Sequence, residues 1–403
     1  MSQASLTLHD LMPREELAEA LSAGHITRRA HPTLPLSLYS YTRGAQYEQL
    51  WNAATTRCRG LVVEDASERV VALPLPKFFN VSEHESGRPY AAALPEEPFE
   101  IQEKVDGSLA VVFHYDGRWH AASKGSFTST QATWAGRHLR RADTTRLVPG
   151  VTYLAEILYP ENRIVVNYGE RRDLVLLAAL RLDGTELPLS EAAEHWTGVG
   201  SAVTVHPPMP LSDLVKLTET NTHPDGTGAT GTDAEGYVLR YASGLRVKAK
   251  IAEYVRLHKT LTGVTVRDIW RAHGIERFAH LPEGRVAQNL GCPLSEVRAH
   301  GGRPLRALLG GVPDEYDAWV RGVVEGVDAA FADRIAAAEA AHAGLAHLAG
   351  DRGAFAREAA RTVADREVRA WTFLLLDGKD ISLPVYRAVR PTALDPFSTD
   401  EEN

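Results

Sequence analysis

Residues 101–110 of the chain read IQEKVDGSLA. An Asp-Gly pair between apolar runs is the ordinary signal for a tight β-hairpin turn. The same pair recurs in HYDGRW, RLDGTE, HPDGTG and LLDGKD, so it carries no functional information by itself. The first stretch differs from those four because Lys104 precedes its turn and Ser108 follows it. The remaining sequence decides whether Lys104 is a surface decoration or a reactive group.

The length and composition predict an ordinary globular protein of two domains or of three small ones. The chain has 403 residues, of which 44% are hydrophobic and 24% are charged. Its start lacks a secretory leader, and its best apolar run, LVLLAAL at 174–180, is too short to span a bilayer. The two cysteines, Cys58 and Cys292, cannot build a four-thiolate zinc site or a disulfide framework. We therefore expect a reduced, cytoplasmic protein without a membrane segment.

The net charge of -8 argues against an indiscriminately basic nucleic-acid coat protein. It leaves room for a local basic region, because the field near a site depends on where the charges lie. The stretch GRHLRRADTTR is such a region, with Arg137, Arg140, Arg141 and Arg146. A solvated helix face is the simplest interpretation of these arginines.

The order of patterns predicts an α+β fold. A helix at 13–24 precedes a strand-rich region from about 57 to 260, in which short β-type runs, including RIVVNY at 163–168, are separated by turn residues. Sequential hairpins with few helices favour an antiparallel-rich domain over a doubly wound parallel sheet. Beyond about 262 the spacing becomes helical. We expect a first domain at 1–260, an all-helical C-terminal domain at 261–390 and a disordered acidic tail at 391–403.

A lysine can act as a nucleophile only where neighbouring groups help it to lose its proton. A lysine that attacks a phosphorus centre must lose its proton, and an unperturbed lysine has a pKa of about 10.4. Nearby cations and partial burial lower that pKa, so the hypothesis predicts other lysines close to Lys104. RVKAKI supplies Lys248 and Lys250 on one face of a strand, ASKGSF supplies Lys124, and LPKFFN supplies Lys77.

A cationic set of this kind would also bind a polyphosphate and the charge that develops on it. Carboxylates would then be needed to hold a magnesium ion, often through its water molecules. Glu156 in YLAEILYP and Glu235 in DAEGYVLRY occupy strand positions suited to this role.

Seven motifs in order carry a resemblance: RCRGLVVED, PLPKFFN, EKVDGSL, SKGSF, TYLAEIL, EGYVLRY and VKAKIAEYVRLH. Together they resemble the bacteriophage T4 RNA ligase 1 family of ATP-dependent RNA ligases, which belongs to the covalent nucleotidyltransferases. The resemblance covers roughly residues 38–260 and makes the first domain an adenylyltransferase domain. The C-terminal region is similar to the family only in its helical character, and a role in RNA specificity would follow from it.

The resemblance implies the following roles. Lys104 would be adenylated by ATP, with Lys248 and Lys250 neutralising the α-phosphate and the departing pyrophosphate. Glu235 and Glu156 would hold Mg²⁺, or Mn²⁺ in its place. The nucleotide or the RNA phosphate would be contacted by Glu103, Arg59, Lys77, Phe79, Lys124, Glu156, Glu235 and Tyr254. Related enzymes often stack an aromatic ring on adenine, but the corresponding strand here, LVLLAALR, has none, so an aliphatic side chain would take that place.

The implied substrates are RNA ends with a 5′-phosphate and a 3′-hydroxyl, broken tRNA among them, joined in RNA repair. The chain lacks G-x-x-x-x-G-K-[ST], so we expect a separate kinase or phosphatase to prepare those ends. Two alternatives remain. Another polynucleotide ligase or adenylyltransferase would normally add a β-rich OB-fold or a cysteine-rich zinc module. A non-catalytic RNA-end or tRNA-binding protein could use the arginines at 137–146, but would have no need for a nucleophile.

Overall fold

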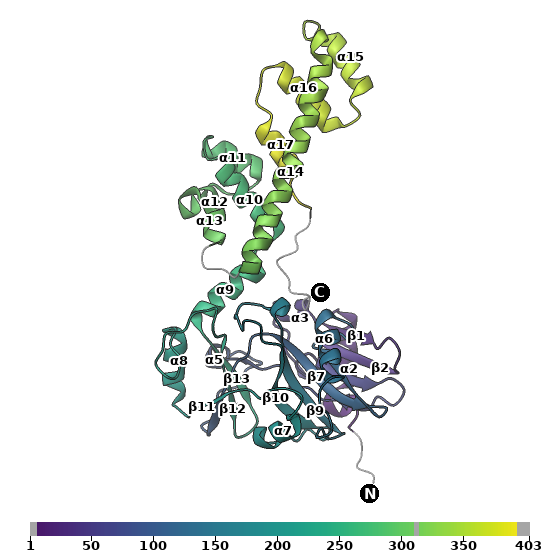
Figure 1. Ribbon diagram of the computed structural model, residues 1–403, viewed down its shortest axis with the longest axis vertical. Helices are drawn as coiled ribbons and strands as arrows, with labels where there is room; N and C mark the ends of the chain where they lie inside the picture. Colours follow the sequence, from purple (N-terminus) through teal and green to yellow (C-terminus); the bar gives the residue numbers. More distant parts are fainter. Residues whose placement is uncertain (1–5, 310–313, 393–403) are drawn as a thin grey trace. The chain divides into compact units, whose positions relative to one another are not determined.

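A computed structural model describes residues 6–309 and 314–392 of the chain. Its contacts divide the chain into two compact units, Met1–His258 and Lys259–Ser398. The first unit is built mainly on antiparallel sheets and the second is helical, so the predicted α+β class with an all-helical C-terminal part is confirmed (Figure 1). The expected disordered tail lies, from residue 393 onward, outside the described residues.

The strands of the first unit form three sheets. The first has the order β1-β2-β3-β4, with β1 Ile26–Ala30, β2 Leu36–Tyr41, β3 Arg59–Glu64 and β4 Val70–Ala72. The second has the order β10-β9-β7-β8, with β7 Ser108–Tyr115, β8 Arg118–Ser123, β9 Val151–Leu158 and β10 Asp173–Arg181. The third has the order β11-β6-β12-β13-β5, with β5 Phe79–Asn80, β6 Phe99–Glu103, β11 Val205–His206, β12 Gly236–Tyr241 and β13 Arg246–Lys250. All pairs are antiparallel except β13 with β5.

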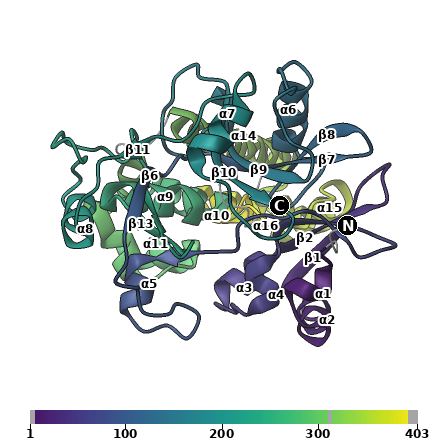
Figure 2. The same cartoon turned by 90° about the horizontal axis from the view of Figure 1, so that it is seen from below.

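Helices cover the outer faces of these sheets. Those of the first unit are α1 Leu8–Leu11, α2 Arg14–Ser22, α3 Arg43–Tyr47, α4 Ala53–Arg57, α5 Val81–Glu85, α6 Thr130–Leu139, η1 Pro160–Asn162, α7 Leu189–Trp196 and α8 Leu211–Glu219. Figure 2 shows α6 and α7 on one side of the second sheet and the first sheet on its other side. Each interface is a hydrophobic layer, with Val112 and Leu139 in one and Val111 and Leu38 in the other. The second sheet is thus buried on both faces, which explains the near-continuous apolar sequence of β7.

The second unit consists of helices that follow α9 Ala252–Gly263, which spans the division between the units. They are α10 Val266–Arg277, α11 Glu283–Leu290, α12 Leu294–Arg298, η2 Ala299–Gly302, α13 Pro304–Leu308, α14 Asp314–Leu345, η3 Ala346–Leu348, α15 Arg352–Thr362, α16 Arg366–Leu376 and α17 Ser382–Ala388. Its main core joins Trp270, Phe331, Trp371 and Tyr386. Among the described residues, no helix is both long and apolar enough to cross a membrane.

Two local predictions are wrong. The Asp106-Gly107 pair does not close a hairpin, because β6 belongs to the third sheet and β7 to the second, and residues 104–107 cross between them. The Asp116-Gly117 pair does close a hairpin, with φ of 47° and 72°, between β7 and β8. RIVVNY at 163–168 forms no strand, because two of its backbone amides donate to a side chain of the crossing segment.

Candidate active site

The crossing segment places Lys104 beside the start of β12 and the end of β13. The Lys104 amide donates to the Gly236 carbonyl at 2.8 Å, which continues the pairing of β6 with β12. Gly236 lies opposite Lys250 on β13, and a Cβ at Gly236 would come within 2.3 Å of a carbonyl oxygen of that strand. The glycine of the E-G motif therefore lets two strands approach closely where Lys104, Glu235 and Lys250 meet.

Glu235 is shared by two lysines. Its Oε2 atom lies 2.6 Å from Nζ of Lys104, and its Oε1 atom lies 2.7 Å from Nζ of Lys250. The Glu235 side chain is only 4% exposed, and burial alone would raise the pKa of its carboxyl group. Lys104 and Lys250 outweigh that effect and lower the pKa to about 2. Glu235 is consequently an anion held between two cations over the whole physiological pH range.

The protonation of Lys104 differs from the prediction. Burial lowers the pKa of its ammonium group, but the charges of Glu235 and then Glu156 more than compensate and raise it above the ordinary value. The prediction that neighbouring cations lower this pKa is therefore wrong. The reason is the direct contact with a carboxylate, which favours the charged amine.

Lys248 behaves in the way predicted for Lys104. Burial, followed by the charges of Lys77, Lys104 and Lys250, brings the pKa of Lys248 well below its ordinary value. Its Nζ atom lies over the Phe78 ring at 5.0 Å. Within the described residues Lys248 forms no ion pair, so an anionic ligand would be its natural charge partner.

A second group of cations lies among aromatic rings. Nζ of Lys77 is 4.5 Å from the ring centroid of Trp51, 5.4 Å from that of Phe79 and 5.6 Å from that of Tyr41. Nζ of Lys124 is 5.2 Å from the Tyr41 centroid. Burial raises the pKa of the Tyr41 phenol, but Lys124, Lys77 and Arg59 reverse that effect and lower it.

These cations are also close to the first group. Burial is the largest cause of the lowered pKa of Lys77, and the charges of Arg59 and Lys124 add to it. Lys77 and Arg59 in turn lower the pKa of Lys248. The structure thus brings the predicted cations Arg59, Lys77, Lys124, Lys104, Lys248 and Lys250 into one region of positive charge.

Asp106 holds the crossing segment, residues 104–107, in place through its hydrogen bonds. Its Oδ2 atom accepts the backbone amides of Val165 and Val166 at 2.9 and 2.8 Å, and its Oδ1 atom accepts the Tyr254 hydroxyl at 2.7 Å. The Asp106 amide donates to the Tyr168 hydroxyl at 2.9 Å. The side chain is 3% exposed, so these bonds compensate an otherwise costly buried carboxylate. Tyr254 consequently acts on the segment that carries Lys104 and also lies 5.1 Å, by its ring centroid, from Nζ of Lys250.

The remaining predicted residues lie at the edges of this site. Glu156 is on β9 opposite Leu109, and its charge raises the pKa of Lys104. Glu103 ends β6, and its charge helps to raise the pKa of Tyr168 and Tyr237. In the described part of the chain no group of three or more His, Cys, Asp or Glu side chains could hold a metal ion. Two carboxylates, Glu235 and Glu156, nevertheless act on one cation, and Mg²⁺ binds to one or two protein carboxylates while keeping several waters. The donor set therefore fits a hydrated divalent ion.

Sequence reasoning missed four residues of this site. Tyr41 and Trp51 surround Lys77, while Tyr168 and Asn162 support the crossing segment. Asn162 accepts the hydroxyl of Ser108 at 3.1 Å and donates to the Ile157 carbonyl at 3.0 Å. Tyr41 and Trp51 lie upstream of the RCRG motif, but no spacing rule distinguishes them from ordinary core positions.

Known proteins share sequence similarity with the part of the chain that carries this site. Residues 57–255 match the family model described as RNA ligase. A protein named as a bifunctional polynucleotide kinase/RNA ligase, from Autographa californica nuclear polyhedrosis virus, is 26% identical over 171 residues, covering 37% of this chain and 24% of the relative. A protein named as an RNA ligase, from Thermovibrio ammonificans, is 32% identical over 143 residues, covering 34% of this chain and 37% of the relative. An archaeal ATP-dependent RNA ligase structure has a TM-score of 0.44 at 15% identity, covering 79% of this chain and 80% of the other.

Residues 57–255, which match the RNA ligase family model, include every site residue discussed above except Tyr41 and Trp51. The matched segments cover 24% and 37% of the two relatives' lengths, so the chain spans well under half of either one.

Proposed function

We propose that the protein is an ATP-dependent RNA ligase that joins a 5′-phosphate end to a 3′-hydroxyl end through a lysyl-AMP intermediate at Lys104. The observation that carries this proposal is the buried Glu235 carboxylate between Nζ of Lys104 and Nζ of Lys250, inside the segment that matches the family. A purely structural ion pair would not need two lysines on one carboxylate, with a third, Lys248, nearby and bearing a lowered pKa.

The first step forms a bond between Nζ of Lys104 and the α-phosphorus of ATP and breaks the bond from that phosphorus to pyrophosphate. Lys104 must first release its proton, which Glu235 and Glu156 oppose in the structure. A divalent ion, Mg²⁺ or Mn²⁺, held by these two carboxylates would supply positive charge that replaces the ammonium charge there. Lys248 and Lys250 would then neutralise the α-phosphate and the leaving pyrophosphate.

The second step transfers AMP from Lys104 to the 5′-phosphate of an RNA end, and the lysine nitrogen regains a proton as it leaves. In the third step the 3′-hydroxyl of the other end attacks this activated phosphate, which forms a phosphodiester and releases AMP. Arg59, Lys77 and Lys124, which lie together, would hold the phosphates through these steps. Phe79 packs beside Lys77. Glu103 is proposed to face the adenine, and Tyr254 to hold the loop of Lys104 through Asp106.

The biological setting that we propose is repair of broken RNA, including tRNA. The 403 residues contain no P-loop motif, so we propose that a kinase or phosphatase activity outside this segment prepares the ends. One relative is named as a fused polynucleotide kinase and RNA ligase, which supports a link between end preparation and joining.

A ligation assay tests the proposal. The protein would be offered single-stranded 5′-phosphate RNA, tRNA cleaved in its anticodon loop and nicked duplex DNA, each with ATP and Mg²⁺. We expect RNA joining that requires the 5′-phosphate and is lost in Lys104→Arg, which keeps the charge but not the reactive amine. Joining of nicked DNA alone would assign the protein to another ligase class, and RNA binding without any joining would favour the non-catalytic alternative.

A further inference from the structure

The basic stretch GRHLRRADTTR borders a hollow in the surface of the first unit. The hollow has a volume of about 640 Å³ and is lined by residues that include Arg137, Arg141, Arg172, Trp134, His138 and Val199. Arg137 lies in the last turn of α6 and Arg141 lies two residues beyond its end, and both line the hollow. The side of the helix that carries Ala135 and Leu139 is buried.

The arginines around this hollow differ in how their charges are used. Arg172 pairs with Glu161, with 3.1 Å between Nη2 and Oε1. Arg171, next to it in sequence, contacts Asp173 Oδ2 through Nε and Nη2 and also binds the Ser201 hydroxyl. Arg137 and Arg141 form no ion pair within the described residues, and both are exposed. The hollow therefore presents two guanidinium groups that are open to an external anion.

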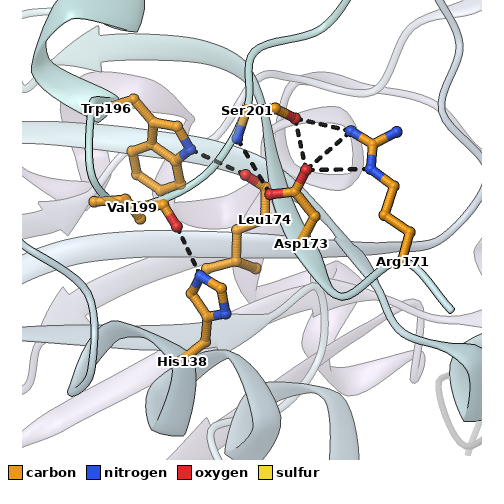
Figure 3. Close-up of polar contacts among 7 residues, drawn as sticks. All are labelled: His138, Arg171, Asp173, Leu174, Trp196, Val199 and Ser201. Atoms are coloured by element: carbon orange, nitrogen blue, oxygen red, sulfur yellow. Dashed lines mark hydrogen bonds and ion pairs between the residues drawn. The ribbon is translucent and has the colours of Figure 1, made fainter.

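The part of the lining that contains Gly198 and Val199 is held by several hydrogen bonds. Figure 3 shows the segment from Trp196 to Ser201 fastened to β10: Trp196 Nε1 donates to the Leu174 carbonyl at 3.0 Å, and Ser201 donates its amide and hydroxyl to Asp173 at 3.1 and 2.7 Å. His138 Nε2 donates to the Val199 carbonyl at 2.7 Å, which ties the same segment to α6. The lining is thus held in place before any ligand arrives.

The aromatic floor argues against a base-stacking site. The Trp134 ring stacks with Tyr159, at 4.9 Å and 17°, and with His138, at 5.2 Å and 28°. The indole therefore already has two aromatic stacking partners within the protein. Arginines beside an aromatic ring that is already stacked are suited to bind the phosphate groups of a nucleic acid. Such contacts depend on charge and not on the nucleotide sequence.

The position of α6 links this hollow to the lysine site. The helix starts six residues after Lys124, and its first turn contacts Asn162, which also accepts the Ser108 hydroxyl. Its ten residues extend for about 15 Å, so the arginines at its C-terminal end lie about that far from the end of the helix that contacts Asn162.

We propose that Arg137 and Arg141 form a phosphate-binding subsite that holds the backbone of the single-stranded RNA substrate outside the lysine site. This inference rests on the proposed function, because it names how that enzyme would hold its RNA. It replaces the simpler interpretation of the arginine-rich stretch as a merely solvated helix face.

The test measures RNA binding directly, by fluorescence anisotropy without ATP. Wild type, R137A/R141A and the control R140A would each be titrated with a labelled single-stranded RNA of about 12 nucleotides and with a dinucleotide. R140A removes an arginine of the same stretch that does not line the hollow. We expect the double variant to bind the longer RNA about tenfold more weakly, while R140A stays within about twofold of wild type.

Two further readouts identify the contact as phosphate binding. The slope of log affinity against log salt should become shallower by about 1.4 in the double variant, because each lost phosphate contact to a single strand is worth about 0.7. R137K/R141K should restore most of the affinity, and the dinucleotide should not distinguish the variants. RNA that carries only a 5′-phosphate end and RNA that carries only a 3′-hydroxyl end are titrated separately, to show which of the two RNA substrates the subsite holds.

Wild-type affinity and salt slope in R137A/R141A would overturn the proposal, as would a loss of equal size in R140A. Lysyl-AMP formation from ATP alone is measured in parallel and should be unchanged in the double variant. If wild type forms no lysyl-AMP but binding still depends on Arg137 and Arg141, the subsite stands and the proposed catalytic function falls.

Discussion

The carboxylate of Glu235 lies 2.6 Å from Nζ of Lys104 and is almost fully buried. This contact favours the charged form of Lys104, because it raises the pKa of the ammonium group against the effect of burial. The same carboxylate holds Lys250 through its other oxygen. In the proposed reaction, ATP and a divalent ion would have to change this local charge before Lys104 could attack.

Replacing Glu235 by Gln should weaken both the fold and the chemistry. The change leaves Lys104 and Lys250 without their anion beside the cation Lys248, and breaking a buried ion pair costs about 3–5 kcal/mol. Lysyl-AMP formation should fall by about 10²–10³-fold, the usual effect of losing one strong electrostatic contact. Urea unfolding and labelled-ATP transfer measure the two effects.

The stability difference should also depend on pH in a defined direction. The pKa of Glu235 is about 2 in the folded protein against 4.5 for a free carboxyl, so its contribution is complete above 4.5 and declines as pH falls toward 2. The gap in unfolding free energy between wild type and Glu235→Gln should therefore narrow from pH 6 to about pH 3.5. A constant gap would show that Glu235 carries no lowered pKa.

The rate of lysyl-AMP formation should rise with pH. Lys104 has a raised pKa, so at neutral pH its reactive neutral form is rare and increases about tenfold per pH unit. Raising the Mg²⁺ concentration should move this rise to lower pH, because a divalent ion bound by Glu235 and Glu156, as proposed, would offset the negative charge that stabilises the ammonium group. Single-turnover rates at several metal concentrations provide the check. Rates that ignore both pH and metal would contradict this account of Lys104.

Replacing Gly107 by Ala should displace the segment that carries Lys104. A Cβ at this position would lie 2.6 Å from the Ile157 carbonyl oxygen and 3.2 Å from Cγ of Glu156, so the segment must move away from β9. We expect a loss of about 1–3 kcal/mol in unfolding free energy together with a severe loss of lysyl-AMP formation. Gly117→Ala is the matched control. That glycine has φ of +72° but open space around it, so strain should lower stability by about 1 kcal/mol and leave the chemistry intact.

Replacing Tyr254 by Phe should remove one hydrogen bond and keep the ring near Lys250. Asp106 would lose the hydroxyl donor at 2.7 Å while it stays buried, at a cost of about 1–3 kcal/mol. We expect a lower melting temperature and slower lysyl-AMP formation at unchanged ATP affinity. The control is Tyr241→Phe, because Tyr241 is a buried tyrosine of β12 that belongs to the hydrophobic core of the third sheet. Equal losses of activity in both variants would show that Tyr254 serves only packing.

The features that the sequence could predict follow short-range rules. The alternation of side chains along a strand predicted that Lys248 and Lys250 lie on one face of β13. The helical spacing of apolar residues predicted that the second unit is helical. The prediction of a hairpin at Asp106-Gly107 was wrong because local turn preference cannot show that β6 and β7 join different sheets.

The prediction of a strand at RIVVNY was wrong because two of its backbone amides bind Asp106, a residue more than fifty positions earlier. The predicted direction of the Lys104 pKa was wrong for the same reason. The decisive carboxylate, Glu235, is distant in sequence and meets Lys104 only through the pairing of β6 with β12.

The most direct measurement is covalent transfer of label from α-labelled ATP to the purified protein, followed by denaturation and peptide mapping. The account predicts one acid-labile AMP on the peptide containing Lys104, formed with Mg²⁺ or Mn²⁺ and absent from Lys104→Arg. A folded wild-type protein that acquires no label, or that acquires it equally in Lys104→Arg, would contradict the central claim.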